Sequence, residues 1–480
     1  MTRLQASLIL VVLWAVIYLP GLGLTEIKGE EGRRILPAIT MIETGNWLVP
    51  YVGGKPYLRK PPLMNWCIAG AFQLTGVRNE WSARGPSALA VLALGLTIVG
   101  GATGGGWMTA KTGLVAALMA MTTFGLLAKA RFAGAEIEGV YVPLTGMAIV
   151  LWMASWVRQR SPWVTWTVPA IFLGLAMLAK GPVHLIFFYA VVLGTLWQAR
   201  AWRELIHPAH GLGILLMTGI FAAWAMPYFQ TEQASAAMTV WKDQMANRVT
   251  ENVFDWSSYL SNIPRGVGDL LPWVVFAPLV FRFYRKVPGV ADARMAAAYR
   301  GGVVACVASF VGLLLVPGVL PRYVLPASIP WMVFTSVALA AEVAPSSAVR
   351  RWWEVNRTMA ILLVPLAIIA PLAAGGAFAF LDKSTAAHFD LPASLVAVLG
   401  STVCLALAAL IVARRVVPTE SGLPALASAA LLGAFAILYA CAAMPAINAR
   451  DNIRPVARQI DGQLKAGEQL VLYDPGYLPV

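Results

Sequence analysis

Charged residues are scarce in this 480-residue sequence: Asp, Glu, Lys and Arg together make up 12% of it, whereas hydrophobic residues make up 59%. A soluble globular domain typically carries about 25% charged residues. The mean hydropathy of +0.70 is also well above the range of soluble globular proteins. These values exclude an ordinary soluble fold and indicate a chain that faces lipid over much of its length.

Cysteine is equally rare, with four widely scattered residues at Cys67, Cys306, Cys404 and Cys441. Their spacing shows neither a disulfide framework nor a thiolate metal motif. The net charge of +13 is not accompanied by a zinc-finger or basic-helix pattern, so we do not expect a nucleic-acid partner. Basic residues that flank membrane helices and face anionic membrane lipids explain this excess better.

Apolar runs close to the length of a bilayer span recur throughout the sequence. The first run, LQASLILVVLWAVIYLP, has no small-residue cleavage site after it, so we interpret it as a retained helix and not as a signal peptide. We predict an all-α polytopic membrane protein with about 13 transmembrane helices. The expected spans are 4–20, 84–101, 112–128, 139–157, 163–179, 182–199, 211–228, 270–284, 301–316, 322–341, 358–379, 392–413 and 423–443.

The distribution of Lys and Arg predicts the orientation of these spans. With a cytoplasmic N-terminus, the predicted inner loops are rich in basic residues, as the positive-inside rule requires. Two predicted outer loops are long, at about 21–83 and 229–269, and a short tail at 444–480 follows a membrane domain of residues 1–443. The basic residues of the inner loops are Lys111, Arg158, Arg160, Arg200, Arg203, Arg285, Lys286, Arg294, Arg300, Arg350, Arg351, Arg357, Arg414 and Arg415.

The first outer loop contains an amphipathic pattern. Ile35, Ile39 and Ile42 recur at helical spacing, and Gly45 is a typical helix-ending residue. Proline is poorly tolerated inside a helix, so Pro37 predicts that this helix begins only near Leu36. We expect such loop helices to lie along the periplasmic membrane surface.

Carboxylates and cations gather in the predicted outer segments, beginning with GEEGRR at residues 29–34. Arginine and lysine can hold a phosphate, and a neighbouring carboxylate can bind a sugar or accept a proton from an attacking hydroxyl. The alternative is that these residues are ordinary interfacial anchors and loop salt bridges. Within GEEGRR we predict that Glu31 pairs with Arg34 along the start of the surface helix.

The run from Glu30 to Trp66, EEGRRILPAITMIETGNWLVPYVGGKPYLRKPPLMNW, resembles the first outer loop of the bacterial lipid A aminoarabinose transferases. These membrane glycosyltransferases have the GT-C fold and are related to the protein O-mannosyltransferases. The later motifs AKGP, which includes Lys180, and RYVLP, which begins at Arg322, are also similar to motifs of that family.

The resemblance implies an inverting transfer of a sugar from a polyprenyl phosphate, such as undecaprenyl phosphate, to a lipid, glycan or protein acceptor. It places the reaction on the periplasmic face of a bacterial inner membrane. The implied catalytic residues are Glu30, Glu136 and Glu138. The implied residues for binding phosphate and sugar are Arg33, Tyr57, Arg59, Lys60, Lys180, Arg248, Arg322 and Tyr323.

Two departures from the family pattern bear on metal binding. Arg59 stands where lipid A transferases have a glutamate, and Gln244 or Met245 stands where they have a histidine. Because those two positions can hold zinc in the family, we predict no zinc and no other cofactor, although a divalent metal ion remains open.

Two other functional classes compete with the enzyme. A transporter or flippase of polyprenyl lipids would carry ionisable residues near the middle of its spans. The predicted spans are almost free of charge, which favours an enzyme that works at the membrane interface. A non-catalytic lipid-binding member of the family is the second alternative, and the retention of Glu30, Glu138 and Lys60 argues against it.

Overall fold

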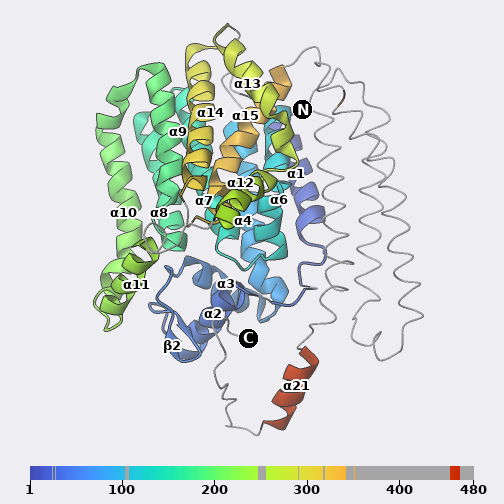
Figure 1. The fold of residues 1–480 in the computed structure, drawn as a ribbon, viewed down its shortest axis with the longest axis vertical. Helices are drawn as coiled ribbons and strands as arrows, with labels where there is room; N and C mark the ends of the chain where they lie inside the picture. Colours follow the sequence, from blue (N-terminus) through green and yellow to red (C-terminus); the bar gives the residue numbers. More distant parts are fainter. Residues whose placement is uncertain are drawn as a thin grey trace, which may run out of the picture.

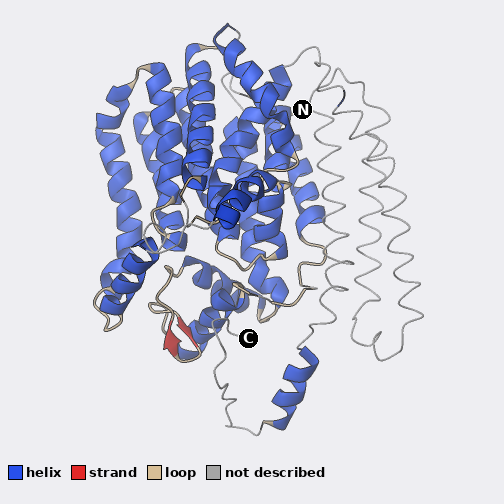
Figure 2. Ribbon diagram, viewed as in Figure 1, coloured by secondary structure: helices blue, strands red, loops and turns tan. Residues whose placement is uncertain are grey.

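The fold is an almost entirely helical bundle, with a single two-stranded hairpin among the residues described (Figures 1 and 2). The computed structural model describes residues 1–23, 25–27, 29–102, 108–246, 256–289, 291–316, 319–341, 351 and 454–464. The last three predicted spans, at 358–379, 392–413 and 423–443, and most of the predicted tail lie outside these residues.

The elements follow one another in the order of their labels in Figure 1. The first group leads from the N-terminus to the central helix: α1 (Arg3–Tyr18), α2 (Gly32–Thr44), β1 (Tyr51–Val52), β2 (Lys55–Pro56), α3 (Leu63–Thr75), α4 (Glu80–Ala102), α5 (Ala110–Met121), α6 (Phe124–Leu127), the π-helix η1 (Ala128–Phe132) and α7 (Glu138–Val157).

The second group completes the bundle and includes several short 3₁₀ helices. It consists of α8 (Pro162–Lys180), α9 (His184–Ala199), η2 (Trp202–Ile206), α10 (Pro208–Tyr228), α11 (Ala234–Ala246), α12 (Trp256–Gly268), η3 (Trp273–Phe276), α13 (Ala277–Lys286), η4 (Val287–Gly289), α14 (Ala293–Leu314), η5 (Pro321–Ala327), α15 (Ser328–Ala341) and α21 (Arg454–Gln463).

Six helical segments of the described chain are long and apolar enough to cross a membrane, and two bent pairs raise this number to eight if each pair is one span. The six are Glu80–Gly101, Glu138–Val157, Pro162–Lys180, Pro208–Tyr228, Ala293–Leu314 and Pro321–Ala341. Each coincides with a predicted span to within several residues, apart from Ala293–Leu314, which begins eight residues before the predicted 301–316. The prediction of a multi-pass helical membrane fold is therefore confirmed, and the total of 13 spans stays a prediction.

Two predicted spans are broken in the structure. The predicted span 112–128 bends by 59° between α5 and α6, and the region of 270–284 follows an 88° bend between Gly268 and Trp273. The two breaks meet, since the amide of Phe124 donates to the carbonyl of Leu271 at 2.9 Å. Pro272 has no amide proton and disfavours a helical conformation in the residue before it, which explains the second break.

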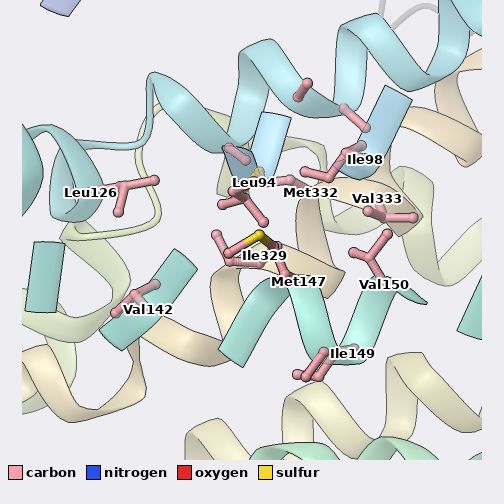
Figure 3. Packing of buried hydrophobic residues seen from close by; sticks show 14 of the residues in the cluster. Leu94, Ile98, Leu126, Val142, Met147, Ile149, Val150, Ile329, Met332 and Val333 are labelled. Carbon is pink, nitrogen blue, oxygen red and sulfur yellow. The ribbon is translucent and has the colours of Figure 1, made fainter. Parts of the chain in front are cut away.

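Helix α7 is the centre of the bundle. It is apolar on all sides, as expected for a helix surrounded by protein, and α4, α8, α9 and α15 pack around it. Figure 3 shows side chains of α4, α7 and α15 in one apolar layer, with Leu94, Met147 and Ile329 near its middle. Gly146 permits this close approach, because a Cβ atom there would lie 2.8 Å from Cγ2 of Ile329.

The segments α2, the β1–β2 hairpin and α3 lie together at one end of the bundle, at the bottom in Figure 1. Gly45 ends α2 with a φ of 70°, as predicted. The predicted start near Leu36 is wrong, because α2 begins at Gly32 and includes Pro37. Helix formation ahead of the proline is favoured by ion pairs in the first turn and by burial of Ile35 and Ala38.

Candidate active site

A charged cavity of about 190 Å³ opens at the end of the bundle where α2 and the hairpin lie. Five separate segments supply its walls: the start of α2, the residues after β2, the turn before α7, the end of α8, and η5. The lining residues are Glu30, Arg33, Arg34, Tyr57, Arg59, Lys60, Glu136, Ile137, Glu138, Lys180, Arg322 and Tyr323.

Ten of the eleven residues proposed from the sequence line this one cavity. The eleventh, Arg248, lies outside the described residues. Arg34 and Ile137 also line the cavity and were not among the proposed site residues. The predicted convergence of outer segments on one face is thus seen in the structure, while the chemical roles of these residues remain proposals.

Glu30 is the centre of the first ion-pair group. Its Oε1 lies 2.8 Å from Nη1 of Arg33, and its Oε2 lies 3.6 Å from Nη2 of Arg34. The guanidinium of Arg34 also lies over the ring of Tyr57, 5.1 Å from its centroid. The Glu30 side chain is 32% exposed, against 7% for that of Glu138, so Glu30 is the more accessible of these two carboxylates to a ligand.

The predicted pair between Glu31 and Arg34 is wrong. Glu31 is buried and turned toward α4, where both of its carboxylate oxygens bind Arg84 at 2.8 Å. Arg34 pairs with Glu30 instead, at i,i+4 spacing. Both glutamates have helical spacing to Arg34, and the distant Arg84 decides which of them remains at the cavity.

Glu138 is the centre of the second group. Its Oε1 lies 2.7 Å from Nζ of Lys180 and 3.4 Å from Nε of Arg322. Glu138 is the first residue of α7 and Lys180 the last of α8, so both charges are favoured by the helix dipoles beside them. The Lys180 ammonium also lies 4.2 Å from the ring centroid of Tyr323. A single carboxylate therefore holds two cations from distant segments at one wall of the cavity.

Glu136 forms the third group with Lys129, whose Nζ lies 2.8 Å from Oε2. Lys129 belongs to the π-helix η1, an irregular turn of a kind that is frequent at functional sites. Burial raises the pKa of the Glu136 carboxyl above its usual range, and the nearby Lys129 charge offsets this only in part. A carboxylate with a raised pKa is a stronger proton acceptor than an ordinary one.

The hairpin places the remaining cations. Gly53 and Gly54 have positive φ values of 56° and 74° at its turn, and the amide of Tyr57 donates to the carbonyl of Pro50 at 2.7 Å. Next in the chain, the carbonyl of Leu58 accepts a 2.6 Å hydrogen bond from Nε1 of Trp241 in α11. These bonds fix the backbone on both sides of Tyr57, so Arg59 and Lys60 are presented to the cavity from an anchored segment.

Within the described segments, no three His, Cys, Asp or Glu side chains gather in a way that could hold a metal ion. The absence of zinc stays a prediction.

Comparison with known proteins supports the resemblance seen in the motifs. A family model described as dolichyl-phosphate-mannose-protein mannosyltransferase matches residues 59–226. The undecaprenyl phosphate-alpha-4-amino-4-deoxy-L-arabinose arabinosyl transferase of Pseudomonas savastanoi pv. phaseolicola is 24% identical over 312 residues, which are 65% of this chain and 56% of the relative. The enzyme of the same name from Pseudomonas paraeruginosa is 25% identical over 351 residues, 69% of this chain and 59% of the relative. The chain thus matches little more than half the length of these curated relatives.

The fold also matches a solved structure. The crystal structure of ArnT from Cupriavidus metallidurans bound to undecaprenyl phosphate superimposes with a TM-score of 0.65 at 20% identity, covering 97% of this chain and 81% of ArnT. The chain therefore shares the GT-C fold of ArnT, and over about two thirds of its length it is similar in sequence to the aminoarabinose transferases.

The residues matched by the family model supply part of the cavity lining. Arg59, Lys60, Glu136, Glu138 and Lys180 lie within residues 59–226, whereas Glu30 and Arg322 lie outside. Sequence reasoning missed Arg84 altogether. The sequence could have indicated it, because an arginine at the start of a predicted apolar span is costly to bury and therefore requires a specific partner.

Proposed function

We propose that the protein is a membrane glycosyltransferase that moves a sugar from a polyprenyl phosphate to a lipid, glycan or protein acceptor, with inversion at the anomeric carbon. One observation carries this proposal: six basic and three acidic side chains from distant segments surround a single cavity at one end of a membrane-helix bundle. Such an arrangement suits a ligand with both a phosphate and a sugar at the membrane interface.

The charge of the cavity suits the leaving group of this reaction. A sugar joined to polyprenyl phosphate is a phosphodiester with one negative charge. When the bond from the anomeric carbon to the phosphate oxygen breaks, the electron pair stays on the phosphate, which gains a second negative charge. Cations such as Lys60, Lys180 and Arg322 therefore interact more strongly with the transition state than with the bound donor, which is the condition for catalysis.

An apolar groove of about 140 Å³ is suited to the polyprenyl chain. It lies between α12, α13, α14 and α15 and is lined by apolar side chains and Cys306. The short helix η5 joins the two sites, because Arg322 and Tyr323 line the charged cavity and Ala327 lines the groove. Five residues of a 3₁₀ helix rise about 10 Å, a distance that a single lipid readily spans.

The carboxylates divide into two roles. Glu30 is more accessible than Glu138, and its oxygens can accept the proton of an attacking hydroxyl or hydrogen-bond to the sugar. Glu136, with its raised pKa, is a second proton acceptor nearby. Glu138 is bound by Lys180 and Arg322, so we assign it the task of orienting these two cations. For a phosphate acceptor no base is needed, and Glu30 then serves in sugar binding.

We propose a bacterial inner membrane as the location, with a periplasmic cavity and a cytoplasmic N-terminus, and the orientation of the helices supports this topology. Helix α7 begins at the cavity with Glu138 and ends at Val157, just before Arg158 and Arg160. Helix α9 likewise ends just before Arg200. These basic residues lie at the ends of the helices away from the cavity, as expected when that end faces the cytoplasm.

The test is turnover of labelled polyprenyl-phosphate sugars by membranes that contain the protein, with Glu30→Gln as the first variant. Release of polyprenyl phosphate by the wild type and its loss in the variant would support both the function and the role of Glu30. Equal turnover in the two would assign proton transfer elsewhere, with Glu136 as the next carboxylate to change. Absence of turnover with every donor and acceptor class would refute the proposal.

A further inference from the structure

The buried ion pair between Arg84 and Glu31 connects two segments that carry carboxylates of the cavity. Arg84 is 1% exposed and Glu31 2% exposed. Nε and Nη2 of Arg84 donate to the two oxygens of Glu31, each at 2.8 Å, in the bidentate geometry that makes such pairs strong. A buried charged pair of this kind is stable only where its remaining hydrogen-bonding capacity is also satisfied.

The other donors of Arg84 hold the chain that leads into GEEGRR. Nη1 donates to the carbonyl of Leu22 at 2.8 Å and to the carbonyl and hydroxyl oxygens of Thr25 at 2.9 Å. Nη2 also donates to the carbonyl of Glu26 at 3.1 Å. A single side chain at the start of α4 thus fixes the backbone at Leu22, Thr25 and Glu26 and the side chain of Glu31.

Glu31 extends this connection to the segment before α7. Its Oε1 also accepts the backbone amide of Ala135 at 3.0 Å, one residue before Glu136. Gly134 packs directly on Arg84, since a Cβ atom at Gly134 would lie 2.9 Å from Cβ of Arg84. The turn that carries Glu136 and Glu138 is therefore docked on the same ion pair that orients the chain next to Glu30.

We propose that Arg84 and Glu31 are positioning residues of the active site. They set the distance between Glu30 on one wall and Glu136 and Glu138 on the other, although neither Arg84 nor Glu31 lines the cavity. This inference rests on the proposed glycosyltransferase function for its effect on turnover. Its structural part, the docking of 133–138 on Glu31, is independent of turnover.

The experiment compares Glu31→Gln with Glu43→Gln in the full-length protein in lipid nanodiscs. Gln at position 31 is neutral and has one acceptor oxygen. If that oxygen takes the place of Oε1, Nη2 of Arg84 loses its acceptor at this residue and the amide of Ala135 keeps only a neutral one; if it takes the place of Oε2, Nε of Arg84 and the amide of Ala135 both lose their acceptor. In either orientation the hydrogen bond from Ala135 to a charged acceptor is lost. Glu43 is the matched control, because it pairs with Arg78 at 2.6 Å in the same part of the chain but is 57% exposed. Arg84→Lys and Arg78→Lys form a second matched pair.

Two measurements are made on each variant. Hydrogen–deuterium exchange in 133–138 should be about tenfold faster in Glu31→Gln than in the wild type, because a hydrogen bond to a charged acceptor is lost. kcat should fall about tenfold while KM for a polyprenyl-phosphate sugar changes less than about twofold, because Lys60, on the anchored segment after the hairpin, stays in place to bind the phosphate. Glu43→Gln should match the wild type in both measurements.

Three results would overturn the proposal: exchange in 133–138 as slow as in the wild type, exchange that rises evenly along the whole chain, or faster exchange in 133–138 with kcat unchanged. If Glu31→Gln does not yield monodisperse protein, Thr25→Val takes its place, since it removes one acceptor of Arg84 at constant shape and should give a smaller change of the same kind. A wild type without turnover would refute the proposed function, while the exchange data would still test the docking of 133–138.

Discussion

Replacing Glu138 by Gln should destabilise the protein more than the same replacement of either of the other cavity glutamates, Glu30 and Glu136. The substitution removes the one carboxylate that faces both Lys180 and Arg322. At an effective dielectric constant of about 20, charges 2.7 Å and 3.4 Å apart attract each other by about 6 and about 5 kcal/mol. Desolvation offsets much of this in the intact site, but in the variant two cations remain close together without their nearest counter-charge.

The expected cost is about 3–5 kcal/mol, the usual penalty for removing one partner of a buried ion pair. The Glu138 and Lys180 side chains are both 7% exposed, so water has little access to Lys180 when its partner is lost, whereas Arg322 is 30% exposed. Glu136→Gln is the matched control two residues earlier. Its partner Lys129 is 22% exposed and can turn toward solvent, so we expect a cost of about 1 kcal/mol there.

Thermal unfolding of the purified variants, followed by the loss of the monodisperse peak, measures the difference. Glu138→Gln should lower Tm by about 5 °C or more, and Glu136→Gln by about 2 °C or less. Polyprenyl phosphate should raise Tm more in Glu138→Gln than in the wild type, because its phosphate supplies the missing negative charge to Lys180 and Arg322. Equal Tm values for the two variants would refute the reasoning that Glu138 is the buried counter-charge of Lys180 and Arg322.

Three further outcomes follow from the site. Glu30→Gln should lower kcat for a hydroxyl acceptor by about 100-fold or more while Glu43→Gln leaves it unchanged, and similar rates for the two would remove Glu30 from the chemistry. If Glu136 accepts the proton, it must be ionised, and its raised pKa means that wild-type activity should fall on acidification at a higher pH than it would with an ordinary carboxyl of pKa near 4.3. If the pH–rate profile of Glu136→Gln shows the same fall in activity at acidic pH, Glu136 is not the proton acceptor. Val307→Trp should raise KM for a long-chain polyprenyl donor and leave KM for a short-chain analogue unchanged, and parallel changes with both donors would argue against the groove as the lipid site.

Apolar length predicted the spanning helices well, because a bilayer demands about 20 apolar residues in a row wherever a helix crosses it. The same criterion could not find α3, since Leu63–Thr75 is too short to span and was included in a loop. It also could not foresee that the chain bends at Thr122–Thr123. There the hydroxyls bond back to the carbonyls of Leu118 and Ala120, and the next amide bonds to Leu271, which is distant in sequence.

The positions of the charged residues predicted the site because the bilayer also restricts where charge can lie. Ionisable groups are so costly next to hydrocarbon that those present must gather at an interface or around a ligand. The spacing of residues along the chain could not predict the individual ion pairs, as Glu31 shows. Its spacing to Arg34 is as favourable as that of Glu30, and only the position of Arg84, 53 residues further along the chain, excludes it from the cavity.

The pattern of ion pairs also bears on how the cavity can favour a transition state. Arg33 and Arg34 share Glu30, and Lys180 and Arg322 share Glu138, so in each group one carboxylate faces two cations. Each group therefore carries an excess of one positive charge, held in place by protein partners before any ligand arrives. In the proposed reaction, a singly charged donor phosphate compensates part of this excess, and the doubly charged leaving group compensates more. Because the cations are already oriented, little reorganisation is needed as the charge develops, and the interaction energy is largest when the sugar–phosphate bond is breaking.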